Sequence, residues 1–541
     1  MKKRKAILSG LLAGIMVLGM AACGKAPETV PEKVEEPAPI VGEAEPAPAV
    51  EADAPAPVVL NLKGGSLGYP NPFRHSGKGQ GTIKMWLLYD ALMEKDEKGL
   101  VPWLATDYTL SDDSLTYTFT LRQGVKWSDG TDLTVDDVLF SYDYYRSNEC
   151  VVSDLVVDGE YMITDSCDNG DGTFSLTVNS VYATNLEYLT RVPILPKHIW
   201  EGIEDPFNYA GKGDCIGSGP FVLTSCDEEK GEYQFVANPL FWGSNPVGQI
   251  NYIAVSDDVL AFDHGEIDYL NAPWDLYEKY ENLEGCKAVS NQPFLGYNMV
   301  FNLRDCAPLQ DMTVRQAIAY AVNRQQIVDL VFNGHATVAS AGYLPEGHSM
   351  RNEAIRTYDC EPEKALELLG GKELELTMKA GDSQELLDIC ELIKLDLAKV
   401  GITLNVVSCD GATLKDAYSK GEYDIYMSYG GGWGADADRL HSMYAGWDPE
   451  TKEAVYSNCV LGYYNEELYQ LAQEQQRCVD SEARTALIGR MQEIIAEEVP
   501  TLPVLNCYDM LVYRPEKYDG WRFIYDYNYS DGVKLSFADA E

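Results

Sequence analysis

Positive charge and histidine are scarce in this sequence. Lys and Arg number 42 against 85 Asp and Glu, which gives a formal net charge of −43 over 541 residues. Such an acidic chain repels nucleic acid and anionic lipid headgroups, which argues strongly against either as a ligand. An acidic surface keeps an exported protein soluble, and a cationic or zwitterionic ligand suits it better than an anion. The six histidines, at 75, 198, 264, 335, 348 and 441, show no metal-ligand spacing, so no metal or cofactor is expected.

Closely spaced cysteine pairs are also missing. Apart from Cys23, twelve cysteines are scattered along the chain and none belongs to a CxxC pair. Their spacings therefore define neither a zinc site nor a disulfide framework. We expect mostly buried free thiols, as in an organism that lives without oxygen.

The amino terminus carries the most specific local signal. Four basic residues precede an apolar run from Ala6 to Ala22, which is typical of a signal peptide over residues 1–22 and short for a membrane span. The run ends in Met-Ala-Ala before Cys23, which resembles the lipobox of bacterial lipoproteins, with Met20 where Leu is usual. The resemblance implies that Cys23 is lipidated and holds the protein on the extracytoplasmic face of the cell membrane. An ordinary signal peptide with a chance cysteine is the alternative.

Residues 23–57 follow as a different kind of segment. After Cys23 they consist largely of Pro, Ala, Glu and Val and contain no aromatic residue. Proline prevents a helix and the glutamates repel one another, so this composition predicts a disordered tether that carries no fold.

Two motifs resemble functional sites but lack the context that those sites need. Gly64–Gly68 fits the GxSxG pattern of hydrolases, but two prolines just after it forbid the helix of a nucleophile elbow, so Ser66 is not expected to be catalytic. Asp168–Gly172 hints at a calcium loop but lacks the closing Glu, so we expect a hairpin turn there. No histidine pairs with Ser66 in the pattern, and the sequence does not favour an enzyme.

Hydrophobic periodicity predicts an α/β fold. An amphipathic helix is expected at 384–400, with Ser383 as its cap and Gly401 as its stop. A strand at 402–407, a short helix at 412–419 and a strand at 423–429 should follow. Earlier in the chain, a helix is expected at 82–93 and a strand at 115–121.

The stretch 423–438, YDIYMSYGGGWGADAD, predicts a binding crevice. Its strand ends in Gly430–Gly432, and residues without a Cβ let a ligand approach the main chain. Trp433 offers a flat wall, and Asp436 and Asp438 offer negative charge. Ligands of open α/β sheets bind just outside the carboxyl ends of strands, where this segment begins.

Several further motifs resemble one family in their order along the chain. They are PWLA and SDDSLTYTFTLRQGVKWSDGTDLTVDDVLFSY at 102–142, GSGPFVL at 217–223, NPLFWGSNP at 238–246, GEIDY at 265–269, YNMVFNLRDCAPLQDMTVRQAIAYAVNRQQIV at 297–328 and ARTALIGRMQEIIAEEVPTLPVL at 483–505. This set resembles the family 5 extracellular solute-binding proteins, the dipeptide, oligopeptide and nickel receptors of ABC importers. The resemblance covers nearly all of the chain from Val58.

The resemblance implies a two-lobed α/β fold of the type II periplasmic-binding kind, with an extra domain inserted in the first lobe. We expect the first lobe at 58–90, 214–292 and 515–541, the inserted domain at 91–213 and the second lobe at 293–514. The protein would work as a monomer that closes on its ligand and then docks on a membrane permease with its ATPase subunits. Only a higher affinity of the ligand for the closed state can drive that closure.

The resemblance also implies a binding site. In the peptide-binding branch a W-x-x-D element follows this strand, and Trp433 to Asp436 match it. Asp436 would pair with the α-amino group of the ligand, and the main chain of Gly432, Trp433 and Gly434 would pair with the peptide backbone. The alternatives are that Trp433 packs the lobe and that Asp436 caps a helix near Asp438, which itself suits a cap better than a ligand.

Two departures from the family pattern leave the ligand open. Oligopeptide receptors carry an Arg three residues before the Trp, where this chain has Gly430, and ADRLHSMY replaces the usual run after the matching Asp. His441 lies close enough to suggest a metal chelate, although an ordinary core or surface histidine is the alternative. Three hypotheses remain: a short-peptide receptor of an importer, the same scaffold binding a metal chelate or another small solute, and a surface sensor that binds peptides without transport.

Overall fold

The computed structural model describes residues 57–540 apart from short segments at 66–67, 76–79, 97–98, 152–154, 158, 212, 291–294, 432–435, 509 and 523–532. The described residues belong to one compact unit, Ala56–Glu541. The predicted signal peptide, Cys23 and nearly all of the predicted tether lie outside them. Among the described helices, none is both long enough and apolar enough to cross a membrane.

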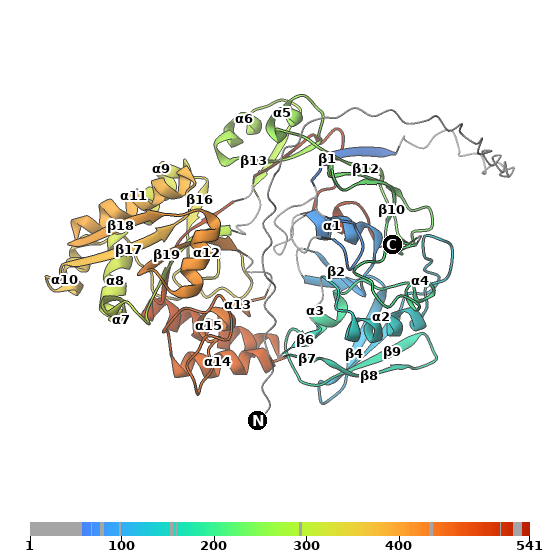
Figure 1. The fold of residues 1–541 in the computed structure, drawn as a ribbon, viewed down its shortest axis with the longest axis horizontal. Helices are drawn as coiled ribbons and strands as arrows, with labels where there is room; N and C mark the ends of the chain where they lie inside the picture. The colour runs from blue at the N-terminus through green and yellow to red at the C-terminus, as the bar shows by residue number, and fades with distance from the viewer. Residues whose placement is uncertain are drawn as a thin grey trace, which may run out of the picture. The chain divides into compact units, whose positions relative to one another are not determined.

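The described strands form six sheets. Figure 1 shows how these sheets are arranged. A four-stranded sheet has the order β1 (Val58–Lys63), β12 (Val247–Ile253), β11 (Glu232–Ala237), β10 (Phe221–Asp227). A second, fully antiparallel, has the order β4 (Ala105–Leu110), β5 (Thr116–Leu121), β9 (Thr173–Val178), β8 (Ile163–Asp168). Two-stranded ribbons join β2 (Met93–Asp96) to β3 (Gly99–Pro102) and β6 (Val156–Val157) to β7 (Glu160–Tyr161).

The largest sheet carries the predicted crevice. Its order is β16 (Ala336–Val338), β20 (Thr501–Cys507), β15 (Leu295–Phe301), β19 (Ile425–Gly431), β17 (Leu374–Ala380), β18 (Ile402–Ser408). β17 runs parallel to both β18 and β19, whereas β15 is antiparallel to β19 and β20. One continuous hydrophobic core fills the space between this sheet and its helices.

A three-stranded sheet connects the rest of the fold to this large sheet. Its order is β13 (Tyr269–Ala272), β21 (Met510–Tyr513), β14 (Lys287–Ser290). The chain passes from β14 into β15 of the large sheet, and later from β20 of the large sheet back into β21. The two sheets are therefore joined by two segments, as a two-lobed fold requires. The domain boundaries given above remain predictions.

Helices accompany the sheets along the whole described chain. They are α1 (Gln80–Leu88), α2 (Val135–Ser147), α3 (Asn185–Thr190), α4 (Lys197–Trp200), α5 (Asp258–Asp263), η1 (Trp274–Leu276), α6 (Tyr277–Glu281), α7 (Ala307–Gln310), α8 (Met312–Ala321), α9 (Arg324–Val331), α10 (Pro362–Leu369), α11 (Gln384–Lys399), α12 (Gly411–Lys420), α13 (Arg439–Tyr444), α14 (Glu466–Arg477), α15 (Ser481–Glu498) and η3 (Lys534–Ser536). Figure 1 shows α9, α11 and α12 beside the large sheet, where they contact its strands.

Several sequence predictions are confirmed around that sheet. The amphipathic helix is α11, and Gly401 follows it with a φ of +86°, a conformation that glycine adopts without strain. Ser383 occupies the capping position, but its side chain makes no capping hydrogen bond. The strand, helix, strand unit is β18, α12 and β19, with β17 lying between the two strands in the sheet. Asp168–Gly172 spans the turn between β8 and β9, as predicted.

Two predictions need correction. The helix expected at 82–93 ends at Leu88, because the main-chain oxygens of Leu88 and Asp90 accept hydrogen bonds from Gly219 and Ile194 instead of from a further helical turn. The side chain of Asp90 is buried in the core. The twelve described cysteines are free thiols, but only five of them are buried, so the expectation that most lie in the core was wrong.

Asp90 is the centre of a buried polar network. Its Oδ1 accepts hydrogen bonds from Trp103 Nε1 at 2.7 Å and from Lys534 Nζ at 2.8 Å, and its Oδ2 accepts one from Ser218 Oγ at 2.8 Å. Lys534 also lies 3.0 Å from Glu94 Oε1, and both its own side chain and that of Asp90 are at most 1% exposed. These charges are stable in the interior because each is paired and hydrogen-bonded.

The pKa of Glu94 follows from the same network. Burial acts to raise it, but Arg191 and Lys534 together hold the pKa of this carboxyl below its ordinary value. A carboxyl whose folded-state pKa is lowered stabilises the protein above its ordinary pKa, and loses that contribution as the pH falls through the folded-state pKa.

Replacing Lys534 by Met should therefore destabilise the protein in a pH-dependent way. At neutral pH we expect the free energy of unfolding to fall by about 3–5 kcal/mol, because two buried carboxylates lose their shared cation. The difference from the parent should shrink in acid, where Glu94 becomes protonated. Urea unfolding followed by tryptophan fluorescence, at neutral pH and at about pH 4, measures both effects.

Lys394→Met is the matched control, because Lys394 is 44% exposed and pairs only with Glu391 on the same helix. It should change the free energy of unfolding by less than about 1 kcal/mol. Equal losses in the two variants would show that the buried network contributes no more than a surface ion pair.

Candidate functional site

The stretch predicted to form a crevice begins at the carboxyl end of β19 in the large sheet. β19 ends at Gly431, and β17 beside it and β18 beyond β17 run parallel to it and end at the same edge. Gly432, Trp433 and Gly434 fall outside the described residues, so their predicted contacts stay predictions. The chain is described again from Asp436, which leads into α13.

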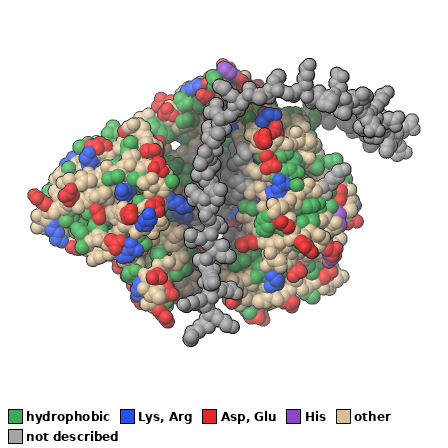
Figure 2. Space-filling view, viewed as in Figure 1, with side chains coloured by type: hydrophobic (Ala, Val, Ile, Leu, Met, Phe, Trp, Pro, Cys, Tyr) green, Lys and Arg blue, Asp and Glu red, His purple; other side chains and the backbone are tan. Residues whose placement is uncertain are grey.

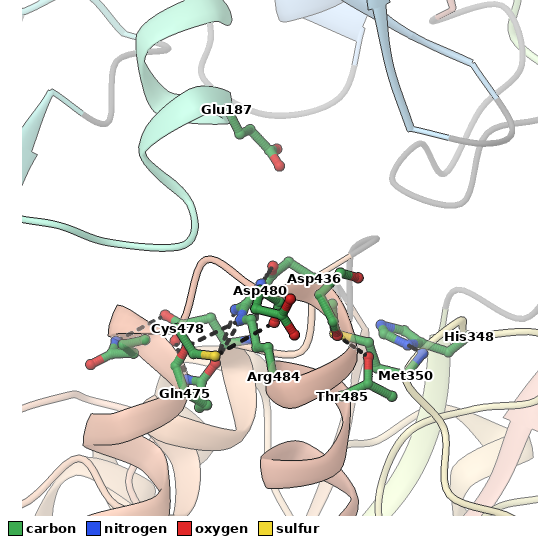
Figure 3. Close-up of polar contacts among 12 residues, drawn as sticks. Glu187, His348, Met350, Asp436, Gln475, Cys478, Asp480, Arg484 and Thr485 are labelled. Atoms are coloured by element: carbon green, nitrogen blue, oxygen red, sulfur yellow. Dashed lines mark hydrogen bonds and ion pairs between the residues drawn. The ribbon is translucent and has the colours of Figure 1, made fainter. Parts of the chain in front are cut away.

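Asp436 forms a two-pronged ion pair with Arg484 of α15 (Figure 3). Arg484 Nη2 donates to Asp436 Oδ1 at 2.8 Å, and Nη1 donates to Oδ2. The Arg484 side chain is only 7% exposed, whereas that of Asp436 is 26% exposed. The carboxylate thus lies at the rim of the lobe, with its charge balanced from within the protein.

Gln475 of α14 completes the environment of Arg484. Its Oε1 accepts from Arg484 Nε at 3.1 Å and from Nη2 at 2.9 Å, so the guanidinium is fixed from two sides. Although burial lowers the pKa of Arg484, Asp436 raises it above its ordinary value, and the side chain stays charged. A rigid, permanently charged arginine therefore sets the orientation of the Asp436 carboxylate.

The Asp436 carboxylate has little remaining hydrogen-bonding capacity. Oδ1 also accepts from the main-chain N–H of Asp438 at 2.8 Å, in addition to Arg484, whereas Arg484 is the only donor to Oδ2 among the described residues. Since a carboxylate oxygen can accept two hydrogen bonds, one position on Oδ2 remains for an outside donor. The contact with Asp438 fits the alternative that Asp436 helps to start the following helix. This contact still leaves the carboxylate able to accept a further hydrogen bond.

Asp438 and His441 face α14. Asp438 occupies the capping position of α13 without a capping hydrogen bond, and its carboxylate accepts from Gln475 Nε2 at 2.9 Å and from Gln476 Nε2 at 3.3 Å. The buried ring of His441 contacts Gln473 Nε2 at 3.1 Å through Nε2 and Gln476 Nε2 at 3.0 Å through Nδ1. Both ring nitrogens are thus occupied by amides. In the described part of the chain, no group of three His, Cys, Asp or Glu residues is arranged to hold a metal ion.

A cavity of about 400 Å³ opens beside these residues. Asp438 and His441 line this cavity. Its remaining aromatic lining residues are Tyr182, Tyr188, Trp447, Tyr456 and Tyr469. This volume is within the range of small-molecule sites, and aromatic walls with a few polar groups are typical of them.

The other face of the sheet edge is aromatic. The ring of Tyr297 on β15 lies 4.7 Å from that of Tyr429 on β19, and Tyr429 is 52% exposed at the end of its strand. The Tyr297 hydroxyl donates to Glu385 Oε1, and Trp274 Nε1 donates to Glu385 Oε2 at 3.0 Å. Burial and the neighbouring carboxylate raise the pKa of Tyr297, so the phenol stays neutral.

The sequence reasoning missed the residues that surround Asp436. Arg484 lies 48 positions further along the chain, within a motif that contributed only to the family resemblance. The sequence did not identify Gln475 or Arg439 as site residues either. The only local signal was an arginine three residues after a predicted ligand-binding aspartate, a spacing that brings side chains together on a helical turn.

These features define the class of protein. Two α/β parts joined by two segments make a two-lobed fold of type II. A family model described as bacterial extracellular solute-binding proteins, family 5 (middle), matches residues 99–452, more than half of the 541-residue chain. The chain belongs to this family, whose members bind solutes and are not enzymes.

Individual relatives agree with this assignment. Di/tripeptide-binding protein 1 of Pseudomonas aeruginosa is 27% identical over 466 residues, which cover 78% of this chain and 83% of the relative. The ABC transporter substrate binding protein CtaP from Listeria monocytogenes aligns with a TM-score of 0.74 at 21% identity, over 89% of this chain and 99% of its own. NikA from Brucella suis in complex with Fe(III)-EDTA aligns with a TM-score of 0.72 at 21% identity, over 89% of this chain and 100% of its own. The two structures share the fold of this chain.

Replacing Arg484 by Gln tests the ion pair at the rim. We expect the free energy of unfolding to fall by about 1.5–3 kcal/mol, because Asp436 loses a charged double hydrogen bond in a partly exposed place. Combining this change with Asp436→Asn should cost less than the sum of the two single changes, with a coupling of about 1 kcal/mol or more. Urea unfolding of the parent, both single variants and the double variant measures the coupling.

Arg490→Gln serves as the control, since Arg490 lies further along α15, is 49% exposed and pairs with two exposed glutamates. Its effect should stay below about 1 kcal/mol. Strict additivity in the Asp436 and Arg484 cycle would contradict the pairing.

Proposed function

We propose that this protein is the substrate-binding lipoprotein of an ABC importer and that it captures short peptides between two closing lobes. The observation that carries the proposal is the partly exposed, rigidly held carboxylate of Asp436 at the carboxyl edge of the large sheet. Di/tripeptide-binding protein 1, the relative reported above, supports the peptide class. The Listeria protein reported above, an ABC transporter substrate binding protein, supports delivery to a permease.

In this proposal the peptide is held at its amino end and along its backbone. Its ammonium group donates to the open position on Asp436 Oδ2, while Arg484 keeps the carboxylate in place. Gly432, Trp433 and Gly434 present main-chain groups and a flat ring to the peptide, which accepts different side chains because backbone pairing does not depend on them. The 400 Å³ cavity beside Asp438 and His441 offers room for a side chain of the ligand.

Closure and delivery follow from differential binding. A ligand that contacts both lobes stabilises the closed state by its extra affinity for that state, and the permease then recognises the closed form. The acidic character of the chain suits the amino end of a peptide. Figure 2 shows Asp and Glu side chains spread over the visible face with Lys and Arg among them.

The alternative ligand is a metal chelate or another small solute on the same scaffold. The Brucella structure with Fe(III)-EDTA supports it. The amide contacts on both nitrogens of His441 make this histidine a poor metal ligand. The alternative of a different class is a surface lipoprotein that senses peptides without importing them. A neighbouring permease gene whose loss abolishes peptide uptake favours import over sensing.

Mass spectrometry of the ligand released from protein purified from its native host is the first test. We expect short peptides from the parent. For Asp436→Asn, affinity for one of those peptides should fall by about 10- to 100-fold, the worth of a charged hydrogen bond. Isothermal titration calorimetry of the parent and the variant, after removal of bound ligand, provides the affinities.

Two comparisons make the result specific. Asp416→Asn on α12 removes an exposed carboxylate, 58% exposed and paired with Lys420, and should leave affinity unchanged. If Asp436 only positions the neighbouring main chain and does not contact the ligand, Arg484→Gln should weaken ligand binding as much as Asp436→Asn does. Release of a metal chelate or a sugar, or undiminished peptide affinity in Asp436→Asn, contradicts the proposal.

Membrane attachment through Cys23 has its own test. Cys23→Ser removes the thiol that would carry the lipid, so the protein should leave the membrane fraction and appear in the soluble fraction. Fractionation of expressing cells, with Cys167→Ser on the exposed end of β8 as control, measures the distribution. An unchanged membrane share for Cys23→Ser would exclude this anchor.

A further inference from the structure

The cavity of about 400 Å³ beside Asp438 is bounded by two distant parts of the chain. The two residues of β6 and three residues between 182 and 188 line one side, and residues between 438 and 477 line the other. Figure 1 shows β6 and β7 next to α14, and the main-chain N–H of Ala183 donates to the carbonyl oxygen of Gln476 at 2.7 Å. A group that enters this cavity therefore contacts the predicted inserted domain and the predicted second lobe at once.

Trp447 brings an unsatisfied hydrogen-bond donor to this cavity. The residue is 3% exposed, and its Nε1 has no acceptor among the described residues. The ring is held in its orientation, because Tyr469 packs against it at 4.7 Å and Lys452 Nζ lies 4.0 Å from its centroid. A buried indole N–H usually has a partner. The cavity therefore lacks an acceptor atom, which an occupant would supply.

The aromatic walls of the cavity are held by their neighbours. The ring of Tyr456 meets that of His441 edge-on, with 5.5 Å between their centroids. His441 is in turn held through both ring nitrogens by the amides of Gln473 and Gln476. Walls that are already in position bind a flat ring at a low cost in side-chain entropy. The cavity is thus suited to an aromatic side chain.

The charges around the cavity favour a neutral occupant. Asp438 and Asp448 line it, but so does the exposed side chain of Arg477, which disfavours a cation. Asp438 accepts from two amides of α14, and Asp448 Oδ1 accepts from two main-chain N–H groups of its own turn. With respect to the described residues, each carboxylate keeps an open acceptor position. A hydroxyl can donate to such a position without bringing a charge that must be desolvated.

We propose that this cavity binds the side chain of an amino-terminal tyrosine of the peptide ligand. The phenol hydroxyl accepts from Trp447 Nε1 and donates to a lining carboxylate, while the ring lies among the aromatic walls. An ammonium group on Asp436, two positions before Asp438, puts the first side chain of the peptide beside the cavity. Because the cavity is bounded by both parts of the chain, the tyrosine also favours their closed arrangement. This assignment rests on the proposed function and deepens it by naming the class of peptide.

The test compares four tripeptides that differ only in their first residue: Tyr-Ala-Ala, Phe-Ala-Ala, Lys-Ala-Ala and Ala-Ala-Ala. We expect the parent to bind Tyr-Ala-Ala about 10- to 100-fold more tightly than Ala-Ala-Ala, because a ring is buried. It should bind Tyr-Ala-Ala about three- to tenfold more tightly than Phe-Ala-Ala, because of the hydroxyl. Lys-Ala-Ala should bind more weakly than Phe-Ala-Ala. Calorimetry on ligand-free protein measures each affinity.

Three variants assign the preference to this cavity. Trp447→Phe keeps a ring but removes the N–H, so the affinities for Tyr-Ala-Ala and Phe-Ala-Ala should come to within about twofold. Tyr456→Ser removes part of a wall and should weaken both aromatic peptides by about threefold or more, with Ala-Ala-Ala unaffected. Tyr456 is 38% exposed, so this variant tests the cavity even where Trp447→Phe fails to fold. Tyr108→Ser, on β4 and also 38% exposed, is the control and should keep the affinities of the parent.

Several outcomes count against the inference. Equal affinity of the parent for Tyr-Ala-Ala and Ala-Ala-Ala overturns it without any variant, and so does a preference for Lys-Ala-Ala. Aromatic preference that is unchanged in Tyr456→Ser overturns it as well, because the preference then arises elsewhere. In these cases peptide capture itself stands. A parent that binds none of the four tripeptides overturns the proposed function and this assignment together.

Discussion

The ion pair between Asp436 and Arg484 determines the geometry of the candidate site. β19 ends at Gly431, and the pair fixes the position of Asp436, where the described chain resumes. From that point α13 begins, so the positions of Arg439 and His441 both depend on it. Because Gln475 holds the arginine as well, two helices set the direction of one carboxylate. The site thus has a rigid base, and ligand binding need not order it first.

Local patterns in the sequence predicted much of the fold. The apolar spacing of 384–400, its glycine stop and the following strand were readable because helix periodicity and chain termination act within a few residues. The sheet order was not readable. β17 lies between β18 and β19 as a result of contacts that no neighbouring residues encode. The ordered motifs, through their family resemblance, supplied the two-lobed arrangement that periodicity alone could not.

The candidate site was predictable to a smaller extent. Glycines after a strand and an aspartate near a tryptophan predicted a site at the carboxyl edge of the sheet, since these residue types have local consequences. The partner of Asp436 comes from 48 positions away, and Tyr343 meets Arg439 across 96 positions. Contacts between residues so far apart in the sequence produce no local spacing pattern from which they could be predicted. What the sequence presented as a free acidic anchor is, in the structure, half of a balanced pair.

The buried contact between Asp90 and Lys534 spans 444 positions. A chain that emerges from a membrane pore in order, from its amino end, contains Asp90 long before it contains Lys534. Until Lys534 is present, the carboxylate of Asp90 and the tryptophans of this region cannot be buried in a complete core. The buried network around Asp90 can therefore be completed only after residue 534 is available to the folding chain. The lobe that holds Asp436, with its residues between 295 and 507, can complete its core earlier.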